Sequence, residues 1–179
     1  MTTLQKVSDL DVLETKVREG AGFPTNNLIM QTIVDISNEI PTNVNALVPS
    51  MAQHLAARFL HALNLCGDLM AIAHRYEMKM DTDAKKEHSE ACLIRAASAG
   101  FTKIGDKKVY ADMDAKYLAA KEAAEDAKSF RIAVVNKHKA LEKAHHHMRK
   151  ISEQNNDGGD NELSNESVNF SQDDDWSLE

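Results

Sequence analysis

The sequence is poor in the residues that build disulfide-rich, sheet-rich or membrane-spanning proteins. Among 179 residues it has two cysteines, three prolines and one tryptophan, and aromatic residues make up 5% of the chain. Cys66 and Cys92 are too few for a disulfide framework, and we expect two buried, reduced thiols. Scarce aromatics and abundant alanine favour closely packed helices over sandwiches or barrels.

Long apolar runs are missing as well. No uninterrupted run reaches the roughly 20 residues of a membrane span. The N-terminal sequence MTTLQKVSDLDVLETK lacks the basic and then apolar pattern of a secretion signal. We therefore expect a cytoplasmic protein (in the host cytoplasm if the source is viral) that does not contact a membrane.

Catalytic and metal-binding motifs are also missing. The sequence has no HExxH, paired CxxC, P-loop, GxGxxG or GxSxG. The consecutive histidines 145–147 would point about 100° apart on a helix, so they could not converge on one ion. His54 and His61 lie two helical turns apart, about 10 Å, which is too far to chelate. We expect no enzyme, no metal and no cofactor.

Charge is distributed unevenly along the chain. Residues 1–84 carry 6 basic and 10 acidic residues (−4), residues 85–152 carry 15 and 9 (+6), and residues 153–179 carry none and 9 (−9), which sum to −7. A basic middle is thus followed by an acidic tail. This asymmetry is the strongest functional indication in the sequence.

Helical periodicity dominates what the sequence does contain. It predicts a helix over 8–19 capped by Ser8, and a second helix that ends at Pro41. A third helix should begin with Ser50 as its cap and extend over 51–80. Residues 81–100 either restart or continue it, with Gly100 as the C-terminal cap. The apolar face of the third helix is predicted to hold Met51, Leu55, Phe59, Leu60, Leu63, Cys66, Met70 and Ala73.

A helix of about 40 residues is predicted to follow, over 112–152. Beyond it, the residues are mostly Asn, Asp, Ser and Glu, a composition typical of disorder. The predicted fold is therefore all-α, with a bundle-like helical domain over 1–152, a long C-terminal helix and a disordered acidic tail over 153–179.

The long helix carries a seam of alternating four- and three-residue steps. Arg131, His138 and His145 would be costly there without partners. One interpretation is an antiparallel pair with the third helix inside the chain; the other is that this end of the seam faces an oligomer or a ligand. The seam comprises Met113, Tyr117, Ala120, Ala124, Ala127, Arg131, Val134, His138, Leu141, His145 and Met148.

Basic residues are concentrated in the second half of this helix. Part of the pattern suits the helix dipole, and the row can also be a solvated surface. It exceeds what capping requires, however, and could neutralise several phosphates. With few aromatics nearby, contact with a nucleic-acid backbone is favoured over base stacking. The candidate residues are Lys128, Arg131, Lys137, Lys139, Lys143, Arg149 and Lys150.

The segment AGFTKIGDKKVYADMD, residues 99–114, interrupts the helical pattern and is predicted to be a short basic loop. Its apolar Phe101 and Ile104 either pin the loop to the core or dock a partner. In the second case Lys103, Lys107 and Lys108 would join them. The stretch could also form a small hairpin.

Within this segment, GFTKIGD resembles the polymerisation segment of RecA-type recombinases: a small residue, an apolar anchor, a base, a second anchor, Gly and an acid. It also resembles the BRC repeats of eukaryotic recombination mediators, with Ile104 where that pattern has alanine. The resemblance implies that Phe101 and Ile104 dock a recombinase.

A second resemblance covers about 45 residues, from KKVYADMDAKYLAAKE to HHHMRKI. This region and the helical layout look like the phage recombination mediators of the UvsY type, small oligomeric single-strand-binding proteins that load a recombinase. The resemblance implies a partner recombinase, single-stranded DNA and a homo-oligomer. Its implied strand contacts are Lys137, Lys139, Lys143, Arg149 and Lys150.

The tail ends in NFSQDDDWSLE, with Phe170 and the only tryptophan, Trp176. Acidic tips with apolar side chains resemble the C-terminal partner-binding segments of single-strand-binding proteins. The tail could also compete for the basic row, or only aid solubility.

Three functions therefore remain in view. The favoured one is a recombination mediator that binds single strands and a recombinase. The others are a helical structural or assembly protein, and a regulator that inhibits another protein through Phe101 or Trp176. An oligomer is expected because a helix of about 60 Å with small seam residues exceeds what the rest of the body can cover.

Overall fold

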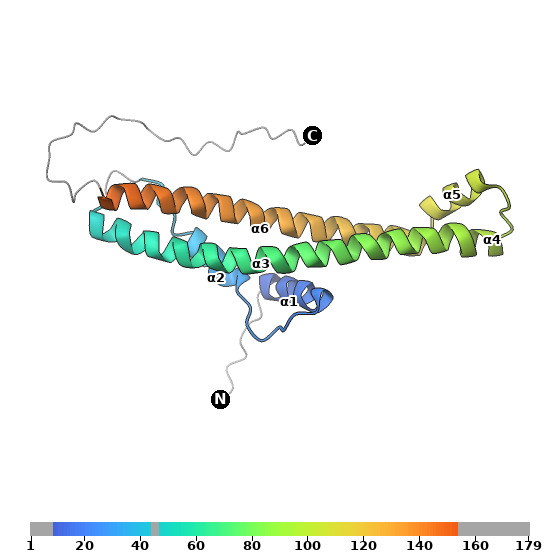
Figure 1. Ribbon diagram of the computed structural model, residues 1–179, viewed down its shortest axis with the longest axis horizontal. Helices are drawn as coiled ribbons and strands as arrows, with labels where there is room; N and C mark the ends of the chain where they lie inside the picture. The colour runs from blue at the N-terminus through green and yellow to red at the C-terminus, as the bar shows by residue number, and fades with distance from the viewer. Residues whose placement is uncertain (1–8, 44–46, 154–179) are drawn as a thin grey trace.

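Two long antiparallel helices form the body of the protein (Figure 1). The computed structural model describes residues 9–43 and 47–153. The first long helix comprises α3 (Pro49–Glu90), a π-helical segment η1 (Ala91–Arg95) and α4 (Ala96–Ser98), which follow one another without a break. The second, α6 (Ala115–Glu153), runs back along the first.

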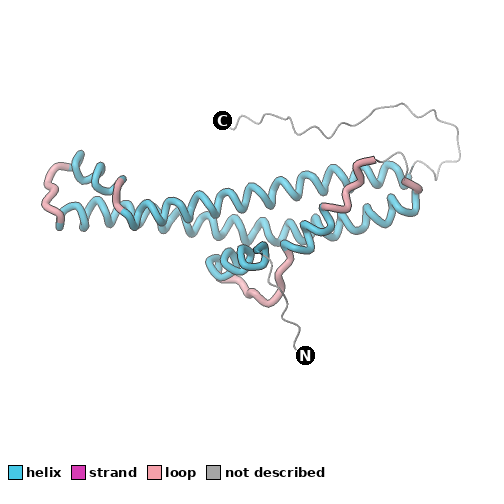
Figure 2. Tube along the Cα trace, turned by 180° about the vertical axis from the view of Figure 1, so that it is seen from behind, coloured by secondary structure: helices cyan, strands magenta, loops and turns pink. Residues whose placement is uncertain are grey.

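Three shorter helices complete the described part of the chain. α1 (Asp9–Ala21) and α2 (Met30–Ser37) pack on one side of the pair, and α5 (Ile104–Asp112) lies at its far end (Figure 1). The described residues contain no strand (Figure 2), which confirms the all-α prediction. The proposed tail from residue 154 onward lies outside the described residues, and Glu153 itself still belongs to α6.

The continuous helix Pro49–Ser98 also contains an 18-residue window of mean hydropathy 1.3, which is long and apolar enough to cross a membrane by length and composition alone. The core helix of a soluble protein passes the same test, and here 33% of the window is buried inside the protein.

Helix ends follow local sequence chemistry. α3 begins at Pro49 after an extended Val48, because proline has a fixed φ and needs no intrahelical N–H bond. The prediction of Ser50 as the cap is therefore wrong. The prediction for Gly100 is confirmed: its φ is +89°, and the Phe101 N–H donates to the Ala96 carbonyl at 3.0 Å, which closes a Schellman turn.

The buried sides of α3 and α6 combine alanines with larger apolar side chains. Ala52, Ala56 and Ala62 of α3 are buried, with Phe59, Cys66 and Leu69 filling the wider spaces. Met51 and Leu60, which the periodicity placed in the core, are 54% and 48% exposed. They are displaced because alanines occupy the side of α3 that meets α6, where the two backbones approach closely.

The seam predicted on α6 pairs with α3 within the chain. Ala127, Val134, Leu141 and Met148 are all buried, at intervals of seven residues. Arg131, His138 and His145 are half-buried at the margin. Arg131 pairs with Glu77 and His145 Nδ1 lies 2.9 Å from the Ala56 carbonyl oxygen, so two of these three polar groups have partners within the chain. Met113 is 75% exposed and does not belong to the seam.

Residues 104–112 form α5, so the predicted basic loop is largely a helix, and no hairpin forms there. Ala111 of α5 is fully buried and Asp106 lies in the first turn, where a carboxylate favours the helix dipole. Gly105 lies within this helix and does not turn the chain.

A buried carboxylate joins α1 to α2. Glu14 is fully buried, and its Oε2 accepts hydrogen bonds from the backbone N–H groups of Ile29 (2.9 Å) and Met30 (2.6 Å). Its Oε1 accepts a bond from Arg18 Nε at 2.6 Å. Glu14 thus caps α2 from another helix, where Ile29, the residue before α2, supplies no side-chain cap.

Replacing Glu14 with alanine should destabilise the protein by about 2–4 kcal/mol, because two buried N–H groups and the Arg18 guanidinium lose their acceptor. Urea unfolding followed by circular dichroism measures this loss. Glu19→Ala, an exposed change on the same helix, is the matched control and should have little effect. Equal midpoints for the two variants would contradict the capping role of Glu14.

The two thiols differ in environment. Cys66 is fully buried, and burial raises its pKa to about 11, with a smaller opposing effect of Lys137. Cys92, in η1, is half-buried, so only one of the two thiols is enclosed as predicted.

A thiol reagent should therefore modify Cys92 in the native protein and leave Cys66 unmodified until the protein unfolds. At pH 8 a pKa of about 11 leaves only roughly one Cys66 side chain in a thousand as the reactive thiolate. Peptide mapping after brief labelling tests this. Labelling of Cys66 as fast as Cys92 would show that the α3–α6 contact opens readily.

Candidate functional site

The sequence predicted seven basic residues of α6 as one nucleic-acid surface, and the structure separates them. Lys128, Lys139, Lys143 and Lys150 are exposed. At 100° per residue they lie on the side of α6 that faces away from α3. We refer to these four lysines as the basic face.

The other three candidates are less suited to contact a phosphate. Arg131 pairs with Glu77 at 2.5 Å, with its side chain 33% exposed. Lys137 is half-buried on the α3 side, where its charge reaches the Cys66 thiol. Arg149 is exposed but pairs with Glu153 at 2.7 Å. Arg131 and Lys137 therefore stand apart from the exposed lysines of the basic face.

The second candidate region lies beyond the N-terminal end of α6. We call residues 91–113, comprising η1, α4, the turn at 99–103, α5 and Met113, the tip. It carries six exposed large apolar side chains: Leu93 (71%), Ile94 (61%), Phe101 (39%), Ile104 (72%), Val109 (61%) and Met113 (75%). Such a density of exposed apolar groups is typical of an interaction surface.

Within the tip, the two predicted anchors behave differently. Phe101 packs against the Tyr110 ring, with ring centroids 5.4 Å apart, so it partly secures the turn to α5. Ile104 is largely exposed and does not pin the segment to the core. Lys103 and Lys108 are exposed and Lys107 is half-buried, so positive charge borders the apolar residues.

An ion-pair cluster attaches the tip to the long helices. Arg95 Nε and Nη2 donate to Asp114 at 2.9 and 2.8 Å, and Nη2 also donates to Glu87. Asp114 Oδ1 in turn accepts the N–H groups of Lys116 and Tyr117, both at 3.1 Å, and so caps α6. The hydrogen bond from Arg95 holds the pKa of Asp114 below its usual value, and the bond to Asp114 raises the pKa of Arg95.

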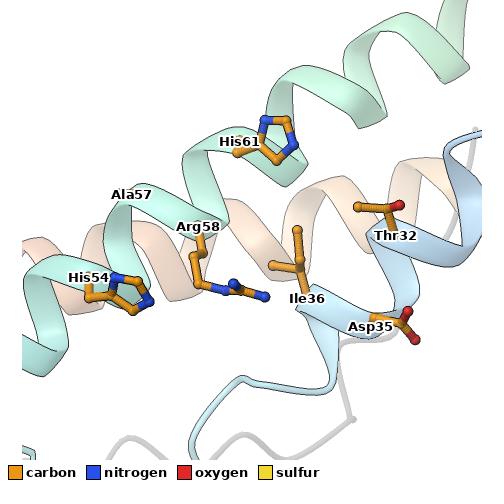
Figure 3. A pocket seen from close by; sticks show the side chains of 7 residues that line it. All are labelled: Thr32, Asp35, Ile36, His54, Ala57, Arg58 and His61. Carbon is orange, nitrogen blue, oxygen red and sulfur yellow. The ribbon is translucent and has the colours of Figure 1, made fainter.

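A cleft of about 520 Å³ lies between α2 and α3 (Figure 3). His54 and His61 stand on either side of Arg58, whose guanidinium is paired with Glu39, and Asp35 accepts a hydrogen bond from Gln31. The cleft therefore offers no convergent set of ligands. Within residues 9–43 and 47–153, no three His, Cys, Asp or Glu side chains are grouped as a metal site.

Several functional candidates escaped the sequence analysis. Leu93 and Ile94 lie in a stretch predicted as helix and Val109 in the predicted loop, and nothing in their sequence spacing marks them as exposed. The role of Arg95 could not be predicted from the sequence, because its acceptors, Glu87 and Asp114, come from separate parts of the chain. The predicted tail residues Phe170 and Trp176 lie outside the described residues.

Comparisons of this chain with protein-family models, with curated proteins and with solved structures gave no match.

Replacing Asp114 with asparagine should loosen the tip, because Arg95 loses its charged acceptor. Amide hydrogen exchange should accelerate in α5 and at the start of α6 while α1 and α2 keep their protection. Since the folded pKa of Asp114 is lowered, its stabilising effect is present above the ordinary aspartate pKa and is lost as the pH falls through the lowered value. Asp126→Asn, an exposed change on α6, should leave exchange at the tip unchanged.

Proposed function

We propose that this protein is a nucleic-acid-binding accessory protein that acts as a recombination mediator. In this proposal the basic face binds the backbone of single-stranded DNA, and the tip docks a RecA-like recombinase. The observation that carries the proposal is the position of the four exposed lysines on the open side of α6, where α3 does not cover them.

The charges around the basic face support this assignment. Several lysines on α3 are near acids of the same helix: Lys85 pairs with Asp81 at 2.5 Å, and Lys86 lies 3.9 Å from Glu90. On α6, by contrast, Lys143 and Lys150 have no carboxylate within 4 Å among the described residues. A strand that meets these lysines would release counterions from several phosphates, which makes binding favourable at low salt.

The separation of the two regions supports a bridging role. The tip lies beyond the start of α6, and the basic face extends from Lys128 to Lys150 toward the other end of this helix of about 58 Å. A recombinase at the tip and a strand along the basic face could therefore be held by one molecule without competing for the same surface. We further propose that the protein is a homo-oligomer, in which basic faces from several copies contact one strand and increase avidity.

Changing Lys139, Lys143 and Lys150 to glutamate should weaken binding of an oligonucleotide by roughly tenfold or more at low salt, because phosphate contacts are replaced by repulsion. The slope of log affinity against log salt should also fall by about 2, since each contact with a single strand contributes about 0.7. Fluorescence anisotropy at several salt concentrations measures both quantities.

The matched control changes Lys16, Lys85 and Lys86, exposed lysines of α1 and α3, to glutamate. It alters the net charge by the same amount and should retain most of the affinity. Equal losses in both variants would indicate a response to net charge alone. If the unmodified protein binds no strand even at low salt, the mediator proposal fails, and a helical structural or assembly protein becomes the better explanation.

A further inference from the structure

The tip has the densest group of exposed large apolar side chains along the described residues. Six of its large apolar side chains are between 39% and 75% exposed within 21 residues. Exposed apolar side chains at this density are typical of a surface that binds another polypeptide segment.

Charge at the tip indicates what kind of occupant it fits. Lys103, Lys107 and Lys108 stand among the apolar side chains, against Asp106 and Asp112. Asp112 lies 3.2 Å from His88, so part of the negative charge is already engaged. The suitable ligand is therefore a short acidic segment that also carries an aromatic or aliphatic side chain.

The chain itself contains such a segment. Asp173, Asp174 and Asp175 precede Trp176, and Leu178 follows it. The basic face could attract the same acidic residues, but it offers nothing for the tryptophan. Between residues 133 and 153 no large apolar side chain is exposed, whereas the tip provides both lysines and apolar groups.

Geometry disfavours docking of this segment on the tip of its own chain. α6 ends at Glu153, at the opposite end of the long pair from the tip (Figure 1), about 58 Å away along the helix. The 23 residues from 154 to 176 reach about 76 Å only when fully extended. A free chain of that length spans on average about 26 Å, so spanning the helix would cost much conformational entropy.

We propose that the acidic segment 173–178 of one copy docks on the tip of a second copy. An antiparallel neighbour brings its α6 end beside the tip, so the segment needs no extreme extension. The apolar side chains of the tip would enclose Trp176, and the three lysines would face the aspartates. The proposal rests on the proposed function only in treating the tip as a docking surface. A recombinase that binds the tip would have to displace this segment.

The test uses the fluorescence of Trp176, the only tryptophan, in the full-length protein. Its emission should shift to shorter wavelength, relative to a free peptide of residues 154–179, as the protein concentration rises. Its quenching by acrylamide should fall in parallel. The Ile104→Asp/Val109→Asp variant should lose both changes, because it places charges in the apolar surface of the tip.

Two controls make the result specific. Met51→Asp/Leu60→Asp changes two exposed apolar residues of α3 outside the tip and should retain the concentration-dependent shift. The Lys139/Lys143/Lys150→Glu variant should retain it too, since the basic face is not the proposed site. Independently, a labelled 154–179 peptide should bind the full-length protein and bind the Ile104/Val109 variant at least tenfold more weakly.

Three results would overturn the proposal: an emission like that of the free peptide at every concentration, a shift that does not depend on concentration, or a shift that is lost in the basic-face variant and kept in the tip variant. If oligomers form through the tip while Trp176 stays exposed, its emission stays like that of the free peptide, and the proposal is overturned. Failure of strand binding is a separate outcome, because the oligonucleotide assay does not involve Ile104 or Val109.

Discussion

Buried alanines on both sides of the contact between α3 and α6 allow the two helices that form the body to lie close together. Ala56 and Ala62 on α3 and Ala127 and Ala144 on α6 are buried, so the two backbones can approach closely over many turns. Alanine buries little apolar surface per residue, and such a pair gains less from burial than a leucine-rich one. Polar contacts at the margin, such as the pair of Arg131 with Glu77, and additional covering helices are therefore needed.

The positions of α1 and α2, the two helices that cover α3, depend on two close contacts. Gly20 of α1 lies so close to Tyr76 of α3 that a Cβ atom there would be 2.3 Å from the ring, which excludes any larger residue without movement. Glu14, fully buried, satisfies the first N–H groups of α2 across the space between the helices. Together these contacts hold α1 and α2 against α3. The tip receives no such cover, and its apolar side chains are correspondingly exposed.

Most of the fold could be predicted from the sequence because most of it is local. Periodicity predicted the long helix over 112–152 within a few residues, and Gly100 marked the end of its partner. The prediction of which side of α3 is buried was partly wrong. A pattern of large apolar residues cannot show that alanines form part of the contact. The prediction of a loop over 99–114 was wrong for the residues of α5. The burial of Ala111, which depends on tertiary packing, stabilises this helix.

The candidate site was less predictable. Lys128, Lys139, Lys143 and Lys150 were identified from composition, but composition could not show that Glu77 engages Arg131 or that Lys137 lies toward Cys66. The apolar tip was half recognised, through Phe101 and Ile104. Its other exposed members, Leu93 and Ile94 of η1, Val109 of α5 and Met113 after α5, were not recognised, because sequence alone does not distinguish a buried side of a helical segment from an open one.

The antiparallel arrangement of α3 and α6 also orders the steps by which the chain can fold. The contact of Arg95 with Asp114 joins residues 19 apart, Arg131 and Glu77 are 54 apart, and His145 and Ala56 are 89 apart. Because the entropy lost on loop closure rises with loop length, pairing is least costly at the tip and can proceed like a zipper toward the chain ends. The surface that stays most open in the finished protein is thus the one whose supporting contacts can form first.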